Sequence, residues 1–313
     1  MDTTSPPFPA ANDPLGETLH QLRLNGSLYC RSELSGDWSL AMPLLPGKMM
    51  FHIITAGQCW LQLDSEAPRL LEQGALVLVT QGQGHIISSD PQLASTPLFE
   101  AGVQQISERY EVLQIAGEGE KTELTCGVMS FDQVAGQQLI QQLPALLLLD
   151  RLEQSSQDWL SSTLEFIAAE AQQLKPGGET IITHLADILI IQLIRYWMEQ
   201  SPQANKGWVG ALRDKHIGIA LRAIHHRPEK NWTVGSLAQE CGMSRSGFSA
   251  RFSQLVGNSV KNYLTEWRMN LACQRLKQNS VPLIVLAEEL GYNSEAAFSR
   301  AFKRVMGISP GKV

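Results

Sequence analysis

Apolar and polar residues alternate along the first part of the chain, in short runs separated by glycines. Residues 53–63 alternate, the apolar run 75–79 lies between Gly74 and the Gly-Gln-Gly turn at 82–84, and residues 123–129 alternate again. Alternation with a period of two places the apolar side chains on one face of a strand. Several short strands separated by glycine turns predict a small β-barrel or sandwich over residues 27–130.

After residue 131 the spacing of apolar residues becomes helical. Residues 156–174 and 180–200 predict two helices, separated by the Pro-Gly-Gly sequence at 176–178. The second helix is apolar on nearly all sides, which predicts a core helix or a helix packed between its own barrel and a partner subunit. Four polar or charged residues interrupt its apolar stretch 181–198, so we expect neither a membrane span nor a membrane partner.

Residues 207–313 contain an internal repeat. The segment 237–243 returns as 286–292, and three residues of the first copy, Phe248, Phe252 and Gly257, return as Phe298, Phe302 and Gly307. In each copy an amphipathic helix ends at a glycine, and a serine then caps a second helix whose phenylalanines face inward. A helix, a short glycine turn and a capped second helix are typical of a helix-turn-helix motif.

The two copies are suited to DNA. Residues 259–277 between them predict a linking helix of about 27 Å, close to one turn of B-DNA at about 34 Å. The outward residues of the second helices are Arg245, Ser246, Ser249 and Ala250 in the first copy and Glu295, Ala296, Ser299 and Arg300 in the second. Arginine, serine and glutamate side chains all bind base edges in the major groove. Four further basic residues are better placed for phosphates: Arg251, Lys261, Lys303 and Arg304.

The distribution of charge supports a DNA-binding half. The formal net charge of the chain is −6, which by itself argues against a nucleic-acid partner. Residues 1–206 carry 10 Lys and Arg against 24 Asp and Glu, a net charge of −14, whereas residues 207–313 carry 15 against 7, a net charge of +8. The basic half suits a polyanion and argues against a protein–protein adaptor. The sign changes at residues 201–206, which we predict to be a linker.

Composition and cysteine usage restrict the class further. With 43% hydrophobic and 18% charged residues, the chain is expected to fold. Its five cysteines are widely spaced and contain no CxxC motif, which fits a reducing cytoplasm and not a disulfide framework. The first twenty residues lack the pattern of a secretory signal. We therefore expect a cytoplasmic protein whose residues 1–14 form a flexible tail.

Residues 209–313 resemble the C-terminal DNA-binding domain of the AraC/XylS family of bacterial transcriptional regulators. The resemblance rests on CGMSRSGF at 241–248, GYNSEAAFSRAFKR at 291–304 and GISPG at 307–311. It implies that bases are read at Ser246, Ser249 and Ala250 in the first copy and at Ala296, Ser299 and Arg300 in the second. It also implies an activator or repressor that binds double-stranded DNA, with RNA polymerase as a further candidate partner.

Residues 15–200 resemble the cupin-type N-terminal domain of one branch of that family. The matching segments are LPGKMMFH at 45–52, GQCWL at 57–61, LEQG at 71–74, GQGH at 82–85 and CG at 126–127. The resemblance implies a barrel-shaped sensor over 15–133 and a helical segment over 134–200 that forms a homodimer. The predicted fold is α+β with two domains: a cupin-like β-barrel with C-terminal helices, and an all-α double helix-turn-helix domain over 207–313.

The predicted barrel has an incomplete set of metal ligands. Metal-binding cupins place two histidines as HxH, then a glutamate and a distant histidine, whereas this chain offers His52 with Ile54 at the second position, and later His85. Two imidazoles without a carboxylate make a poor octahedral site, and zinc would need water or the Cys59 thiolate. We expect no metal and no cofactor, and the alternative of a metal-dependent cupin enzyme is disfavoured. His52, Cys59 and His85 are candidates for a pocket that binds an unidentified small effector.

The cysteines leave a second sensing chemistry open. Cys30 and Cys126 lie on separate predicted strands, and reversible oxidation needs an exposed thiolate with a resolving partner. Cys126 shares an alternation face with Leu124 and Val128, which favours burial and an inert thiol. Regulation by an oxidant through Cys30 and Cys126 is therefore the alternative to a small organic effector.

Overall fold

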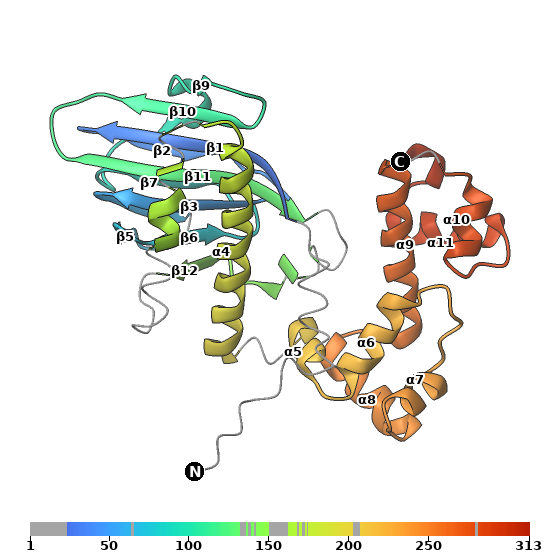
Figure 1. Ribbon diagram of the computed structural model, residues 1–313. Coiled ribbons are helices and arrows are strands. Elements are labelled where there is room, and N and C mark those ends of the chain that lie inside the picture. Colours follow the sequence, from blue (N-terminus) through green and yellow to red (C-terminus); the bar gives the residue numbers. More distant parts are fainter. Residues whose placement is uncertain are drawn as a thin grey trace, which may run out of the picture. The chain divides into compact units, whose positions relative to one another are not determined.

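The chain forms two compact units in a computed structural model (Figure 1). One, the β unit, holds Leu24–Phe131 and Leu143–Glu199, and the other, the helical unit, includes Gln200–Val313. The structure describes residues 24–63, 66–131, 136, 139–140, 142–149, 162–167, 169–170, 173, 175–202, 207–278 and 281–313. The predicted tail and most of the predicted linker lie outside the described residues.

The β unit consists of two facing sheets. The seven-stranded sheet has the strand order β12-β6-β3-β11-β1-β10-β9, and the five-stranded sheet has the order β5-β4-β7-β2-β8. The strands are β1 (Leu24–Ser35), β2 (Ser39–Met42), β3 (Met49–Ala56), β4 (Gln58–Leu63), β5 (Arg69–Glu72), β6 (Leu76–Val79), β7 (His85–Ser88), β8 (Thr96–Pro97), β9 (Gln104–Gln105), β10 (Tyr110–Ile115), β11 (Lys121–Phe131) and β12 (Leu146–Leu149), with a 3-10 turn, η1, at Leu98–Glu100.

The core of the β unit lies between the two sheets. Leu34, Ile54 and Leu113 enter it from the seven-stranded sheet, and Leu40 and Ile87 enter it from the five-stranded sheet. Burial of each such side chain contributes about 1.5–3 kcal/mol relative to exposure, so the sum favours the facing arrangement. The alternating pattern of the sequence therefore corresponds to a two-layer β domain, and the predicted fold class is confirmed.

Residues 53–63, which alternate as in one strand, belong to two strands of different sheets. β3 ends at Ala56 and β4 begins at Gln58, and Gly57 between them has a φ of +73°. A Cβ atom at Gly57 would lie 2.4 Å from the carbonyl oxygen of Lys121, so only glycine fits this corner. Met50 and Ile54 of β3 and Cys59 and Leu61 of β4 face the core between the sheets, so the core-facing positions change from even to odd numbers at this corner.

Residues 134–200, predicted to be helical, also contain a strand. β12 pairs antiparallel with β6 and forms one edge of the seven-stranded sheet. A short run of leucines suits a buried strand as well as a helix, so the period of the sequence does not separate the two. Residues 162–167 are helical, within the predicted helix 156–174, whose remaining residues lie largely outside the described part.

Helix α4 (Gly178–Gln200) confirms the second predicted helix and runs along one side of the sheets (Figure 1). It buries Leu189 and Leu193 and leaves Ile181 and Ile188 exposed by 38% and 44%. Contrary to the sequence argument, Thr180–Gln200 is long and apolar enough to cross a membrane by length and composition alone. In the most apolar part of this helix 44% is buried inside the protein, so one side of the helix packs on the β unit and the other is exposed.

The helical unit contains the two predicted helix-turn-helix motifs. Its helices are α5 (Gly207–Arg213), α6 (Ile217–His226), α7 (Val234–Glu240), α8 (Arg245–Val256), α9 (Val260–Gln278), α10 (Leu283–Glu289) and α11 (Glu295–Met306), followed by a 3-10 turn, η3 (Pro310–Lys312). The motifs are α7–α8 and α10–α11, and α9 is the linking helix, about 28 Å long for its 19 residues. Two helices that the sequence analysis did not identify, α5 and α6, pack on the first motif through buried residues such as Trp208 and Leu221.

Candidate DNA-binding surface and sensor core

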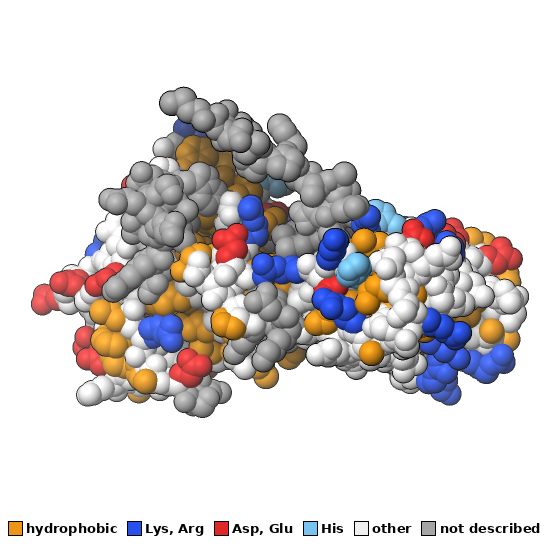
Figure 2. Space-filling model, turned by 90° about the horizontal axis from the view of Figure 1, so that it is seen from below, with side chains coloured by type: hydrophobic (Ala, Val, Ile, Leu, Met, Phe, Trp, Pro, Cys, Tyr) orange, Lys and Arg blue, Asp and Glu red, His pale blue; other side chains and the backbone are white. Residues whose placement is uncertain are grey.

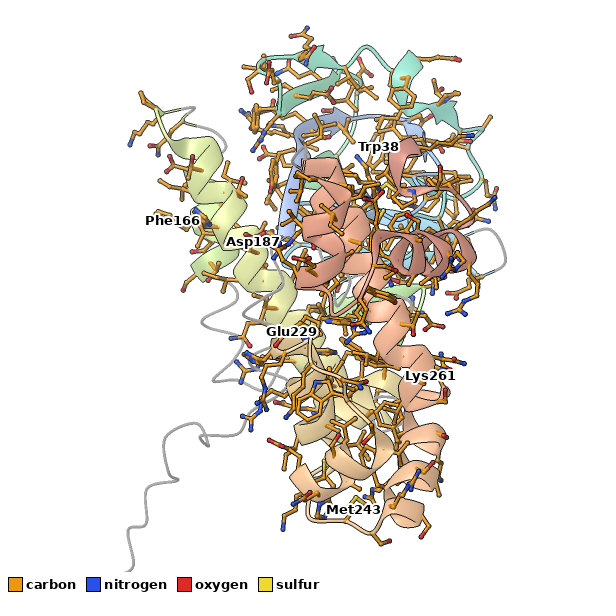
Figure 3. All side chains as sticks on the ribbon, turned by 90° about the vertical axis from the view of Figure 1, so that its right-hand side faces the viewer. Trp38, Phe166, Asp187, Glu229, Met243 and Lys261 are labelled. Carbon is orange, nitrogen blue, oxygen red and sulfur yellow. The ribbon has the colours of Figure 1, made fainter. Side chains whose placement is uncertain are left out.

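The corners of the two helix-turn-helix motifs have the same geometry. Gly242 and Gly291 follow α7 and α10 with φ angles of +64° and +74°. In the first corner the amide of Met243 donates to the carbonyl of Ala238 at 2.9 Å, and Tyr292 makes the equivalent bond in the second at 2.8 Å. Such a bond closes a helix whose next residue is left-handed. Figure 3 shows Met243 at the corner between α7 and α8.

The second helices of the motifs, α8 and α11, also begin and end alike. The side chains of Ser244 and Ser294 accept hydrogen bonds from the amides three residues later, and Gly257 and Gly307 end the helices with φ of +73° and +75°. Two fully buried phenylalanines hold the inner face of each helix: Phe248, Phe252, Phe298 and Phe302. The outer faces of α8 and α11 are therefore presented to solvent at equivalent positions.

These outer faces carry the residues predicted to bind DNA. The exposed ones are Arg245, Ser246, Ala250 and Arg251 on α8, and Glu295, Ala296, Arg300, Lys303 and Arg304 on α11. Ser249 and Ser299 are half-buried, and Lys261 is exposed at the start of α9, where Figure 3 shows it. Figure 2 shows Lys and Arg side chains in groups on the surface of the helical unit.

Arg251 has a partner within the helical unit. Its Nε and Nη2 atoms donate to Oδ2 of Asp214 at 2.9 and 2.5 Å. The other carboxylate oxygen of Asp214 accepts from the amides of His216 and Ile217. Partial burial opposes ionisation of Asp214, but these hydrogen bonds, led by that of Arg251, hold its pKa below the usual value. Arg251 therefore ties α8 to the turn between α5 and α6.

Arg268 on α9 is a positioning residue that the sequence analysis missed. Its Nε donates to the carbonyl of Pro228 at 2.6 Å, and its Nη2 donates to those of Glu229 and Lys230 at 3.2 and 3.0 Å. Its guanidinium also lies over the ring of Tyr292, 5.5 Å from the centroid. Arg268 thus joins the loop that precedes the first motif to the corner of the second. A single arginine in a helical pattern carries no sequence signal for this role.

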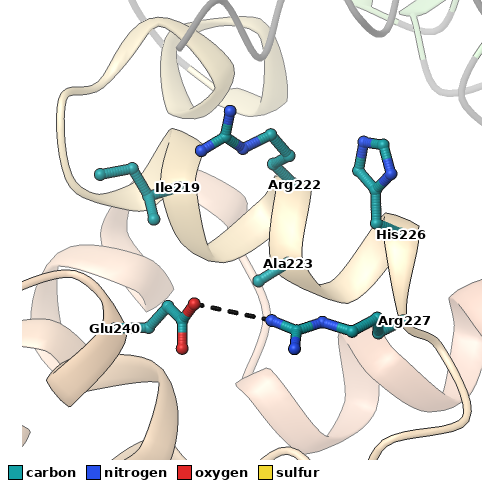
Figure 4. A pocket seen from close by; sticks show the side chains of 6 residues that line it. All are labelled: Ile219, Arg222, Ala223, His226, Arg227 and Glu240. Carbon is teal, nitrogen blue, oxygen red and sulfur yellow. Dashed lines mark ion pairs between the residues drawn. The ribbon is translucent and has the colours of Figure 1, made fainter. Parts of the chain in front are cut away.

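A cavity of about 270 Å³ lies between α6 and α7, lined by Ile219, Arg222, Ala223, His226, Arg227 and Glu240 (Figure 4). Arg227 and Glu240 form an ion pair across it at 3.6 Å. Because both side chains are exposed, the pair contributes little to stability. The packing of α6 on α7 rests instead on buried side chains such as Leu221 and Leu237.

In the β unit, the predicted pocket residues His52, Cys59 and His85 are all buried in the core. Nε2 of His52 lies 2.7 Å from Nε2 of His85, and Nδ1 of His52 lies 3.0 Å from Sγ of Cys126. Nδ1 of His85 lies 3.1 Å from the carbonyl oxygen of Gln83. One arrangement satisfies all these atoms: the Cys126 thiol donates to His52, His52 donates to His85, and His85 donates to the carbonyl.

This chain of hydrogen bonds holds neutral groups. Burial, reinforced by the neighbouring imidazole, lowers the pKa of His52 well below its usual value, and burial lowers the pKa of His85 to about 4. Burial also raises the pKa of the Cys126 thiol. Among the described residues, no group of three or more His, Cys, Asp or Glu is arranged to hold a metal ion.

The two cysteines of the redox alternative are cross-strand partners. Cys30 on β1 pairs directly with Cys126 on β11, which the sequence did not predict. Burial raises the pKa of Cys30 to about 11, and Cys126 is raised for the same reason. Since the thiolate is the reactive form, both are poor nucleophiles near neutral pH. Regulation by an oxidant is therefore not favoured.

Comparison with known proteins agrees with the predictions for the N-terminal and the C-terminal half of the chain. A family model described as a cupin matches residues 13–199, and one described as a helix-turn-helix domain matches residues 237–313. The chain is 33% identical to the HTH-type transcriptional regulator AlkR of Acinetobacter baylyi, over 95% of this chain and 97% of the relative. It is 32% identical to an AraC-like transcription regulator of Streptomyces lividans, over 96% of this chain and 97% of the relative.

Among solved structures, the DNA-binding domain of AdpA in complex with a target DNA is 28% identical to this chain. The match covers 32% of this chain and 88% of that one, with a TM-score of 0.30. The relatives that match nearly the whole chain are transcriptional regulators. The chain therefore belongs to the AraC family of DNA-binding transcriptional regulators, with a cupin-like N-terminal domain and a C-terminal helix-turn-helix domain.

Proposed function

We propose that α8 and α11 read two successive major-groove segments of one DNA site. The observation that carries this proposal is the equivalence of the two helices, whose caps, corners and exposed positions correspond. The length of α9, about 28 Å, suits a spacing near one turn of B-DNA. Base edges would be contacted by Arg245, Ser246, Ser249 and Ala250 on α8 and by Glu295, Ala296, Ser299 and Arg300 on α11. Phosphates would be bound by Lys261, Lys303 and Arg304, and by Arg251 in addition to its bond with Asp214.

Arg300→Ala tests the proposal. A bound site is first located by genomic footprinting, and the affinities of wild type and variant are then measured on that site and on each single base-pair change. We expect Arg300→Ala to lose discrimination of about 1–3 kcal/mol at one base pair and little at the others. Lys303→Ala is the matched control, because loss of a phosphate contact weakens binding to every sequence equally. Equal loss on all sequences for Arg300→Ala would show that Arg300 binds only phosphate.

We propose also that the protein acts as a homodimer through residues 134–200. The outer face of α4 carries Ile181, Leu185 and Ile188, and the first and last of these are 38% and 44% exposed. Phe166, in the helical residues before α4, is 51% exposed. Apolar side chains gathered on an exposed surface are typical of a protein–protein interface.

We propose that the protein works without catalysis in the cytoplasm, where the β unit senses a small effector and the helical unit binds DNA and contacts RNA polymerase. The naming of its relatives as transcriptional regulators supports this role. The five cysteines are free thiols, which suits a reducing compartment. Burial keeps His52 and His85 neutral near pH 7 and makes both of them weak bases.

A further inference from the structure

The outer faces of α8 and α11 have the same geometry but carry different charges. Phe248 of α8 corresponds to Phe298 of α11, so each exposed residue of one helix has a counterpart on the other. At three exposed positions α11 has a cation where α8 has a small or neutral side chain: Arg300 for Ala250, Lys303 for Ser253 and Arg304 for Gln254. In the described part of the chain no carboxylate forms an ion pair with these three cations, so they are available to a polyanion.

Of the two cations on α8, one is already bound within the protein. Arg251 forms an ion pair with Asp214, whose side chain is only 8% exposed, and its counterpart on α11 is Ala301. The other cation, Arg245, has Glu295 as its counterpart. The outer face of α8, all of which the structure describes, thus offers one unpaired cation, whereas that of α11 offers three cations and one carboxylate.

The segments that follow the two helices do not offset this difference. Lys261 lies in the first turn of α9, after α8, and Lys312 lies in η3, after α11, and both are exposed. Each motif therefore has one further lysine. Because affinity for DNA rises with the number of phosphates that cations neutralise, the unequal charges of α8 and α11 imply unequal affinities.

The side chains that α8 presents to base edges are also short. Ser246 and Ser249 can donate to or accept from several bases, and Ala250 can contact only apolar groups such as the methyl group of thymine. Arg300, at the position of Ala250, can instead bind guanine through two hydrogen bonds. The capacity to discriminate between sequences is therefore greater on α11, as the charge is.

We propose that the second motif, α10–α11, supplies most of the affinity and most of the sequence discrimination, and that the first motif, α7–α8, accepts many sequences beside it. This inference rests on the proposed function, because it takes both α8 and α11 to enter the major groove. It adds that one half of the DNA site is strictly specified and contains a G·C pair contacted by Arg300, while the half bound by α8 is loosely specified.

The salt dependence of DNA binding tests the difference in affinity. Each phosphate contact adds about 0.9 to the steepness with which log K falls against log salt concentration. Lys303→Ala together with Arg304→Ala should therefore lower this steepness by about 2 in the full-length protein. Ser253→Ala together with Gln254→Ala, the matched control at the corresponding positions of α8, should leave it unchanged. All four side chains are exposed, so neither double variant disturbs the core.

The reciprocal variant, Ser253→Lys together with Gln254→Arg, gives α8 two of the cations of α11. It should raise the steepness of the salt dependence by about 2. No change in the Lys303 and Arg304 double variant, or an equal loss in the two alanine double variants, would overturn the proposal. So would an unchanged steepness in the reciprocal variant, because positions 253 and 254 would then not correspond to 303 and 304 on DNA.

Base-pair changes in each half of the site test the difference in discrimination. The half bound by α11 is the one that contains the base pair at which Arg300→Ala loses discrimination. Scrambling this half should weaken binding by wild type about 100-fold, and scrambling the other half about 10-fold or less. Equal losses would overturn the inference and leave the proposed function standing. If Arg300→Ala loses discrimination at no base pair, the proposed function fails, and this inference fails with it.

Discussion

Among single residues, His52 and His85 link the folding of the β unit to pH. His85 has a pKa of about 4 in the folded protein, compared with about 6.5 in an unfolded chain. Below pH 6.5 the unfolded chain therefore binds a proton that the folded protein does not accept. The stability contributed by the neutral imidazole is complete above pH 6.5 and is lost as the pH falls toward 4.

The first prediction follows from this loss of stability at low pH. Between pH 7 and pH 5 the free energy of unfolding should fall by about 2 kcal/mol on account of His85. In His85→Gln this part of the pH dependence should disappear. Native-state hydrogen exchange of the β3 and β11 amides at both pH values measures it.

His226→Gln is the matched control, because His226 is exposed on α6, in the helical unit. It should keep the pH dependence that the wild type shows at the β3 and β11 amides. Asp187, on α4, contributes with the opposite sign, since burial raises its pKa to about 6 and protonation then favours the folded state. That contribution is common to wild type and both variants and cancels in the comparison. If the free energy of unfolding fell as much in His85→Gln as in the wild type, the acid sensitivity would belong to other groups.

The contacts of single residues in the β unit were the features that the sequence predicted least well. His52 and Cys126 are 74 residues apart and His52 and His85 are 33 apart, so their contacts depend on strand register. Alternation predicted that Cys126 faces inward, but it carried no information on which strand lies beside it.

Among elements, the two helix-turn-helix corners look equivalent but differ in their surroundings. A Cβ atom at Gly291 would lie 2.1 Å from the carbonyl oxygen of Glu229, whereas nothing lies within 4 Å of one at Gly242. Both glycines have positive φ, so alanine is strained at either position. Only at Gly291 must the backbone also move.

The second prediction compares Gly242→Ala with Gly291→Ala. The first should lower the free energy of unfolding by about 1 kcal/mol, the cost of the left-handed conformation alone. The second should lower it by about 3 kcal/mol or more, because a backbone clash is added to this strain. Urea unfolding of the full chain measures both. Equal losses of unfolding free energy would show that the loop at Glu229 moves aside at no cost.

The third prediction concerns Arg268, which holds that loop. Arg268→Ala removes hydrogen bonds from a charged donor to three carbonyls, a loss of about 1.5–3 kcal/mol. Binding to a full DNA site should weaken more than binding to a half-site, since the variant loosens one motif relative to the other. Arg275→Ala is the control, because Arg275 pairs with the exposed Glu289 on the neighbouring helix. An equal loss on half-site and full site would reduce Arg268 to a purely local role.

The helices and turns of the helical unit were the features that the sequence predicted best, for a physical reason. In the helical unit each signal is local: Ser244 caps α8, Gly242 turns the corner before it and Phe248 follows within one turn. In the β unit, the corner at Gly57 was not predicted because Ile53 and Ile54 are both apolar, so the sequence does not reveal that the core-facing positions shift by one residue there. Strand β12 was not predicted because four consecutive leucines fit both the period of a strand and that of a helix.

At the scale of the whole molecule, the proposed homodimer depends on the outer face of α4. Ile188→Lys places a charge in the middle of this apolar face. If the face is an interface, the dissociation constant of the dimer should rise about 10-fold or more, measured by sedimentation equilibrium. Leu44→Lys is the matched control, since Leu44 is an exposed apolar residue of the β unit outside α4. An unchanged dimer in Ile188→Lys would place the interface elsewhere.

The two motifs of one chain follow each other along α9, and their exposed residues differ: Arg245, Ser246 and Ala250 on one helix, Glu295, Ala296 and Arg300 on the other. A DNA site bound by such a pair of helices would be asymmetric, unlike a palindrome. Turning the site around on the chromosome would preserve affinity but reverse the direction in which the bound protein faces. Under the proposed reading of DNA, the sequence bound by each chain would therefore have one orientation relative to the promoter, and that orientation would be part of the regulatory instruction.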